Sequence, residues 1–267
     1  MSVPTSGPPV VLLPGLLETH HMWETMIDRL RWSPDRMAVF DLPGHMPGDD
    51  AETIAQDLET GGWIDRLAEQ IRDRFGGVPA LLIGHSTGGM MALWLAQRYP
   101  ELIDSLVLIG ALTKGDRGRT FDPGARFFSV PMLGEMAFRA GMTMWLSSPE
   151  KFQQGYALAA ADRKLEVPAP EAMRAQLSAC DPSALYATAM WVLNADVGAG
   201  LAQVGCPVLA IIGSRDPIVP PAHQIGIIRG APQGVAQMMP AGHLPFAECP
   251  DLVVAALRGW QLRQARG

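Results

Sequence analysis

One serine in this sequence lies in a setting that suits nucleophilic chemistry. Ser86 is the centre of the pentapeptide GHSTG, which matches the pattern G-x-S-x-G, with the apolar segment ALLI before it and the helical pattern MMALWLAQRY after it. A tight turn between a strand and a helix exposes the serine hydroxyl at the carboxyl end of a sheet, above the helix N-terminus. The bare pattern also occurs by chance in loops, so its position between a strand and a helix is what makes Ser86 a candidate nucleophile.

His243 is the candidate for the base that such a serine needs, because a serine hydroxyl is a weak nucleophile near neutral pH. It ends the segment PAGH, just after the last apolar run and before a helical pattern that begins near Pro250. A carboxylate must fix the tautomer of this histidine and stabilise its charged form. Asp216, two residues beyond the apolar run PVLAIIGS, is the favoured acid. Asp116 is the rival, in a glycine- and charge-rich segment after SLVLIGA.

Acyl transfer to serine also requires donors for the negative charge that develops on the carbonyl oxygen. The backbone N–H of the residue after the nucleophile, here Thr87, is one expected donor. The other is expected from the loop after an earlier strand, here Pro14-Gly15-Leu16, in which we favour the N–H of Leu16. Taken alone, the Pro-Gly pair is equally typical of a plain turn.

The elements that must position these residues follow from hydrophobic patterning, because short apolar runs alternate with longer amphipathic patterns. The runs predict strands at 10–15, 37–44, 80–86, 105–111, 207–214 and 235–243. The amphipathic patterns predict helices at 22–31, 63–75, 88–98, 221–229 and 250–264. Continuous apolarity is typical of strands buried on both faces, and strands alternating with helices indicate βαβ units. We therefore expect an α/β fold with a doubly wound, mostly parallel sheet.

The segment 112–203 interrupts this alternation, since it contains no convincing strand and its Met-rich and Ala-rich helical patterns are punctuated by prolines. A structureless loop of that length is implausible in a compact domain. We therefore predict a helical cap at 112–203 and a core formed by 1–111 and 204–267. The cap begins at the carboxyl end of a strand, which is the end expected to carry Ser86, so we expect it to cover the site.

The composition is that of an ordinary folded protein, with 48% hydrophobic and 18% charged residues among 267. A net charge of −6 with scattered Lys and Arg residues argues against nucleic acid as a partner. The three cysteines are far apart and indicate reduced thiols rather than disulfides. The first apolar stretch is too short for a signal peptide or a membrane span, so we expect a cytoplasmic protein without a membrane partner.

Metal and cofactor sites are not indicated by the sequence. The histidines do not pair at i, i+4, and no His/Asp/Glu cluster has the spacing of metal ligands. No phosphate-binding loop or dinucleotide motif is visible. We therefore expect chemistry that needs no metal and no cofactor.

The segments LLPGLLETHHMW, FDLPGH, LLIGHSTGG, PVLAIIGSRDPIVP and AGHLPFAECP resemble, in this order, the sequence blocks of the α/β-hydrolase superfamily. The resemblance covers 10–111 and 204–262 and is nearest to small bacterial carboxylesterases, a group that includes the pimeloyl-carrier-protein methyl ester esterases. It implies that Ser86, Asp216 and His243 form a catalytic triad, in the chain order usual for this fold, and that the two N–H groups named above are the oxyanion donors.

Two features depart from the superfamily pattern. Its members usually begin with an antiparallel hairpin, whereas only nine residues precede Val10 here, so we expect about six strands and no N-terminal hairpin. Many relatives have His-Gly in the oxyanion loop, where this chain has Pro14-Gly15. Because the donor is a backbone group, we expect function to survive this change.

These residues point to a hydrolase that cleaves a carboxylic ester of a small-molecule acyl substrate through an acyl-enzyme on Ser86. A lactone or a thioester suits the same groups. Three alternatives stay open: a C–C bond hydrolase, a cofactor-free lyase or oxygenase in which His243 alone abstracts a proton, and a ligand receptor with slow turnover.

Four further side chains are candidates for the substrate pocket, each with a structural alternative. His20, with its neighbour His21, follows the oxyanion loop and either contacts the acyl group or packs the first helix. Met144 and Trp145 belong to a Met-rich apolar patch of the cap. This patch either lines a pocket for a hydrophobic substrate, since Met fills irregular spaces, or packs the cap helices together.

Three polar residues near the candidate site are expected to have structural roles. Asp41 and His45 lie in the segment DLPGH, which we interpret as a turn. His85 precedes the nucleophile, and its side chain is expected to point away from it, so His85 is not a candidate base.

Overall fold

The computed structural model describes residues 7–115, 130, 132–163, 165 and 168–264. Its sheet has six strands in the order β2-β1-β3-β4-β5-β6, and every neighbouring pair is parallel. The strands are β1 (Val10–Leu13), β2 (Met37–Val39), β3 (Ala80–His85), β4 (Ile103–Ile109), β5 (Val208–Gly213) and β6 (Gly234–Met239). The expected parallel sheet is confirmed, and within the described residues no strand precedes β1.

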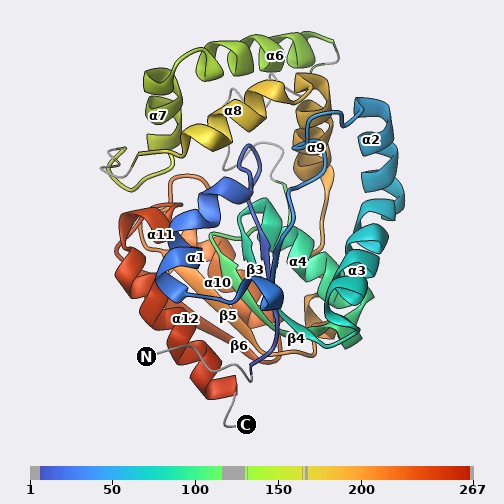
Figure 1. The fold of residues 1–267 in the computed structure, drawn as a ribbon, viewed down its shortest axis with the longest axis vertical. Coiled ribbons are helices and arrows are strands. Elements are labelled where there is room, and N and C mark those ends of the chain that lie inside the picture. Colours follow the sequence, from blue (N-terminus) through green and yellow to red (C-terminus); the bar gives the residue numbers. More distant parts are fainter. Residues whose placement is uncertain (1–6, 116–129, 131, 164, 166–167, 265–267) are drawn as a thin grey trace.

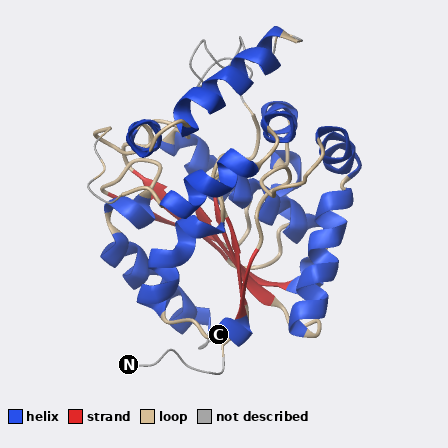
Figure 2. Cartoon of the chain, turned by 45° about the horizontal axis from the view of Figure 1, so that its top comes forward, coloured by secondary structure: helices blue, strands red, loops and turns tan. Residues whose placement is uncertain are grey.

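The helices of the core cover both faces of this sheet (Figures 1 and 2). They are α1 (Glu24–Leu30), α2 (Ala51–Thr60), α3 (Gly62–Phe75), α4 (Thr87–Arg98), α10 (Pro221–Gly230), α11 (Pro245–Glu248) and α12 (Pro250–Gln264). Short 3-10 turns complete the connections at His20–Trp23, Pro34–Arg36, Pro100–Leu102 and Gly198–Gln203.

Alternate residues of each strand contribute to two separate apolar layers, because successive strand side chains point to opposite faces. Leu12 and Ile83 face a layer with α1 and α12, whereas Val11 and Leu82 face a layer with α3 and α4. All six residues of β3 are buried. The central strands are thus apolar on both faces, which is why their sequences read as continuous runs.

Helix α2 is an element that the sequence reasoning missed. Its residues are mostly polar and only Ile54 and Leu58 are buried. The Asp50 side chain caps its N-terminus by accepting a hydrogen bond from the Thr53 N–H at 2.9 Å. A capping aspartate followed by two apolar residues at i, i+4 spacing is the signal that could have revealed it.

Between β4 and β5 the described chain is helical and leaves the sheet (Figure 1). The helices are α6 (Leu133–Leu146), α7 (Pro149–Ala157), α8 (Glu171–Ala179) and α9 (Pro182–Asn194). The outgoing and returning chains lie side by side, because Lys114 and Asp196 form an antiparallel bridge and the Val197 N–H donates to the Thr113 carbonyl at 2.7 Å. In the described part of the chain, no helix has the length and apolarity to cross a membrane.

Candidate active site

Ser86 occupies a strained turn between β3 and α4. Its backbone has φ 51° and ψ −116°, a conformation that non-glycine residues rarely adopt and that proteins keep mainly at functional sites. The turn also packs tightly, because a Cβ at Gly88 would lie 2.4 Å from the carbonyl oxygens of Leu13 and Pro14. The serine turn therefore lies directly against the loop that follows β1.

His243 and Asp216 meet at the ends of β6 and β5. The Nδ1–H of His243 donates to Asp216 Oδ2 at 2.8 Å, and both side chains are buried. The other carboxylate oxygen accepts the N–H groups of Ile218 and Val219, each at 2.8 Å. The carboxylate of Asp216 accepts a hydrogen bond from Nδ1–H, which keeps the ring hydrogen on Nδ1. Nε2 then has a free lone pair, and a histidine in this tautomer can act as a base.

Two residues that sequence reasoning missed hold this pair in place. Gln224 on α10 donates to Asp216 Oδ2 at 2.9 Å. Glu248 accepts the N–H groups of Gly242 and Leu244, on either side of the histidine, at 2.8 and 3.3 Å. Neither residue belongs to a motif, and neither could be assigned before the packing of α10 and α11 was known.

Among the three residues 15–17 in the loop after β1, one N–H group makes no hydrogen bond to a described residue. Gly15 N–H donates to Glu18 Oε2 at 2.8 Å, and Leu17 N–H donates to His45 Nε2 at 2.9 Å. Between them, the N–H of Leu16 has no partner among the described residues, and the same holds for the N–H of Thr87 at the start of α4. These are the two groups expected from the sequence as oxyanion donors.

His45 shapes this loop as a neutral acceptor. Its Nδ1–H donates to the Pro43 carbonyl at 2.9 Å, which leaves Nε2 free to accept from Leu17. Burial lowers the pKa of His45, so the neutral form is favoured. The expected structural role of the segment DLPGH thus includes a direct contact with the oxyanion loop.

A buried ion pair joins the oxyanion loop, the serine turn and the histidine loop. His85 Nδ1 lies 2.6 Å from Glu18 Oε2, and His85 Nε2–H donates to the His243 carbonyl at 2.8 Å. Both acceptors favour a doubly protonated ring. Burial opposes that charge, but the Glu18 carboxylate, the His243 carbonyl and the charge of Asp216 together outweigh burial and raise the pKa of His85. His85 therefore has a buried partner, Glu18, that the sequence did not reveal, and both side chains are among those that line the cavity of Ser86.

One cavity of about 360 Å³ contains Ser86 and His243. The core lines it with residues from the loops after β1, β3, β4, β5 and β6, and the helices α6, α7 and α9 supply most of the remaining lining. The lining from these three helices consists of Phe138, Trp145, Gly155, Tyr156, Tyr186, Ala189, Met190, Val192 and Leu193. None of these helical residues carries a charge, so the cavity suits an apolar substrate group.

A protein-family profile described as the alpha/beta hydrolase fold matches residues 8–250. The chain belongs to this family. Its sheet, the strained serine turn and the positions of the loops agree with that assignment, and the resemblance found in the sequence is confirmed.

Proteins similar in sequence include a pimeloyl-[acyl-carrier protein] methyl ester esterase of Neisseria meningitidis serogroup C. It is 29% identical over 261 residues, which cover 96% of this chain and 94% of that protein. The sn-1-specific diacylglycerol lipase ABHD11 of Mus musculus is 29% identical over 222 residues, which cover 78% of this chain and 64% of that protein.

Solved structures of the same fold include a putative aryl esterase from Burkholderia cenocepacia. The TM-score is 0.74 at 19% identity, and the alignment covers 100% of this chain and 94% of that chain. At this identity the likeness concerns the fold.

The candidate pocket residues from the sequence are distributed differently from the expectation. Trp145 lines the cavity, whereas Met144 is 64% exposed and is not among the lining residues. Adjacent residues of a helix point in different directions, which separates these two. His20 is also outside the lining, because its Nδ1 bonds to Asp41 Oδ2 at 2.8 Å. Of these three candidates, therefore, only Trp145 lines the pocket, and His20 and Met144 do not.

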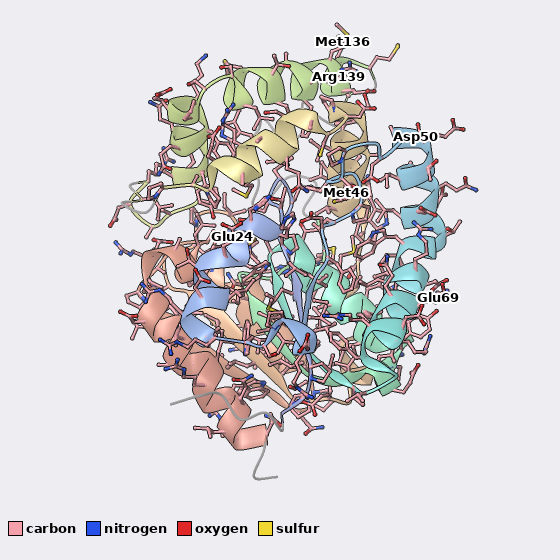
Figure 3. All side chains as sticks on the ribbon, in the orientation of Figure 1. Glu24, Met46, Asp50, Glu69, Met136 and Arg139 are labelled. Atoms are coloured by element: carbon pink, nitrogen blue, oxygen red, sulfur yellow. The ribbon has the colours of Figure 1, made fainter. Side chains whose placement is uncertain are left out.

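His21 and the exposed residue Met136 are not among the residues that line the cavity. His21 contacts Glu24 at 2.6 Å on the exposed side of the first turn. Met136 lies on the outer side of α6 and is 67% exposed (Figure 3). Asp116, the rival acid, lies outside the described residues. Within the described ranges, no group of three or more His, Cys, Asp or Glu side chains could hold a metal ion.

Proposed function

We propose that this protein is a serine esterase that cleaves a carboxylic ester with an apolar acyl group through an acyl-enzyme on Ser86. The observation that carries the proposal is the shared cavity of Ser86, in its strained turn, and His243, bonded to Asp216. Family membership and the esterase names of similar proteins point to the same reaction class.

In the first half-reaction, Ser86 Oγ attacks the carbonyl carbon while His243 Nε2 accepts the hydroxyl proton. The carbonyl oxygen becomes an oxyanion, for which the free N–H groups of Leu16 and Thr87 are available as donors. When the intermediate collapses, the bond to the alcohol breaks and His243 returns the proton to the leaving oxygen. The acyl group stays on Ser86 as an ester.

In the second half-reaction, water replaces the alcohol. His243 accepts a proton from this water, whose oxygen attacks the acyl carbon. The bond to Ser86 Oγ then breaks, Oγ regains a proton from His243, and the carboxylic acid leaves. Asp216 stabilises the charged imidazole in both halves, and its other contacts to Val219 and Gln224 keep it from turning away.

We further propose that the helical segment 112–203 acts as a cap that selects the acyl group, on a core of 1–111 and 204–267. The support is that Trp145 and Val192 from this segment line the same cavity as Ser86. Their apolar surfaces favour aliphatic or aromatic groups over charged ones.

A panel of 4-nitrophenyl esters from acetate to decanoate tests the proposed function, together with a fluorophosphonate probe followed by peptide mapping. We expect turnover that peaks above acetate, and modification of Ser86 alone. Lactones and thioesters of the favoured acyl length belong in the same panel, because the mechanism admits them.

Each alternative function has a distinct outcome in this assay. A lyase or oxygenase that relies on His243 alone retains activity in Ser86→Ala. A receptor with slow turnover releases one equivalent of nitrophenol per chain and then stops. A C–C hydrolase cleaves β-diketones faster than esters of matched size. Any of these results would replace the esterase proposal.

A further inference from the structure

The hydroxyl of Tyr156 has no hydrogen-bond partner among the residues that the structure describes. Tyr156 lies in the last turn of α7, lines the cavity of Ser86 and is 8% exposed. Its ring stacks near Phe152, with centroids 6.3 Å apart. No hydrogen bond joins its hydroxyl to a described residue. The described residues also leave five fully buried polar atoms unpaired, but the Tyr156 hydroxyl is not one of these and its side chain lines the cavity. A group that enters the cavity can therefore supply the partner that the protein does not.

The apolar wall around Tyr156 supplies no such partner. Trp145, the neighbouring polar ring, already donates its Nε1–H to the Phe152 carbonyl at 3.1 Å. Glu18 also lines the cavity, and its Oε2 accepts from Gly15 and from His85. The cavity itself is therefore the space from which an acceptor for the Tyr156 hydroxyl can come.

Tyr156 is also held in a fixed position relative to the reacting groups. The Ala159 N–H donates to the Tyr156 carbonyl at 3.2 Å, and the Ala159 carbonyl accepts the His243 N–H at 2.8 Å. The Ala161 N–H donates to Glu248 Oε2 at 2.9 Å, on the same side chain that supports the histidine loop. The end of α7 is thereby fastened to the loop of His243, and a donor on it is preorganised.

We propose that the Tyr156 hydroxyl donates a hydrogen bond to a second oxygen of the substrate, remote from the ester that is cleaved. The favoured substrates are then apolar esters that carry one additional carbonyl or ether oxygen. This inference rests on the proposed esterase function and specifies its substrate class. A site built to hydrogen-bond a substrate group discriminates strongly against analogues that lack it, because its own polar atom is then left unpaired.

The protonation state of Tyr156 agrees with a donor role. Burial, and then the negative charge of Glu18, raise the pKa of Tyr156 well above its usual value. The phenol therefore keeps its proton throughout the neutral range.

Matched ester pairs test this proposal. In the acyl arm, methyl 4-oxopentanoate is compared with methyl pentanoate, and the 5-oxo and unsubstituted hexanoates form a second pair. In the alcohol arm, 2-methoxyethyl acetate is compared with butyl acetate. For each pair, kcat/KM is measured for the wild type and for Tyr156→Phe. Tyr99→Phe is the matched control, since Tyr99 donates to Asp65 at 2.8 Å and is not among the residues that line the cavity.

We expect the wild type to prefer the oxygenated member of at least one pair by about tenfold, and Tyr156→Phe to abolish that preference. Tyr99→Phe should keep it. The arm that responds tells whether the second oxygen belongs to the acyl or the alcohol part. If Tyr156→Phe lowers kcat/KM equally for both members of every pair, the hydroxyl acts on the reacting ester and the proposal is overturned. The proposal is also overturned if the wild type shows no preference within any pair.

Binding without turnover separates this proposal from the esterase function. Ser86→Ala and the double variant Ser86→Ala/Tyr156→Phe are titrated with methyl 4-oxopentanoate, 5-oxohexanoate, pentanoate and hexanoate, and with the two acetates. Trp145 in the cavity wall provides the fluorescence signal. Tighter binding of an oxygenated ester to Ser86→Ala, lost in the double variant, supports the proposal even if wild-type turnover is absent. Equal binding within all pairs overturns it.

Discussion

The loops after β1, β3, β5 and β6 place polar side chains at the site, and nearly all of these side chains form hydrogen bonds within the protein. The lining from α6, α7 and α9, in contrast, is almost wholly apolar. On the loop side, Glu18, His85 and Asp216 are buried and each has at least one partner at 2.9 Å or less. On the helical side, the hydroxyl of Tyr156 has no hydrogen-bond partner among the residues that the structure describes.

This difference separates two tasks. Chemistry needs atoms fixed to within a fraction of an ångström, and networks of buried hydrogen bonds provide that rigidity. Selection of a substrate needs shape and a few polar contacts that the ligand completes. The two walls therefore predict different responses to mutation: loss of rate for every substrate on the loop side, and a change of preference on the helical side.

The largest expected effect is at Ser86. Ser86→Ala should lower kcat by about a million-fold on every ester, because no nucleophile remains. The temperature of thermal unfolding should be unchanged or slightly higher, since the strained turn loses only a hydroxyl. The measurement is steady-state hydrolysis with a burst assay to exclude contaminating enzyme. Residual activity within a hundredfold of the wild type would contradict the assignment.

Next in size is the acid. Asp216→Asn should lower kcat by about 10⁴-fold, because an amide presents the wrong hydrogen-bonding face to His243 and favours the wrong tautomer. Asp116→Asn is the matched control and should change little. If Asp116→Asn, and not Asp216→Asn, lowers kcat by this amount, the acid comes from the segment after β4.

A smaller effect is expected from the buried pair behind the nucleophile. Glu18→Gln should destabilise the fold by about 3 kcal/mol and lower kcat more than it raises KM, because His85 then lies buried without its counter-charge. Glu24→Gln is the control, since Glu24 forms an exposed pair with His21 (Figure 3).

The pH dependence of this variant follows from the pKa of His85, which Glu18 raises. A raised pKa contributes stability below the ordinary histidine pKa, and that contribution is lost as the pH rises through the folded-state value. The stability difference between wild type and Glu18→Gln, measured by urea unfolding, should therefore be larger at pH 6 than at pH 9. A difference that grows toward alkaline pH would show that the pair is not charged.

The smallest effect in rate, and the one specific to the helical wall, is expected from Trp145→Ala. Removal of this ring enlarges the cavity, so the preferred acyl length should increase by a few carbons while the rate on acetate changes less than about tenfold. Met144→Ala, its exposed neighbour, should leave the profile unchanged. An unchanged profile in both variants would mean that this wall does not select the acyl group.

The fold was predictable because its signals are local. Each strand is a short run whose apolarity reflects burial on two faces, and the serine turn is defined by five consecutive residues. The roles of Ser86, Asp216 and His243 stay predictions, but their placement after β3, β5 and β6 followed from the order of motifs in the chain. Helix α2 was missed because most of its residues are polar and its apolar contacts are few.

Only the tertiary structure decided the contacts between residues that are far apart in the chain. Glu18 contacts His85, Glu248 contacts Ala161, and Tyr156 lines the same cavity as Ser86. No spacing in the sequence encodes these encounters, because they depend on how separate loops and helices pack. The sequence by itself determined which residues could carry chemistry and which segments form the sheet. Packing decided which of the described polar groups find partners in the protein, because a hydrogen bond requires atoms within about 3 Å and only the assembled fold sets that distance.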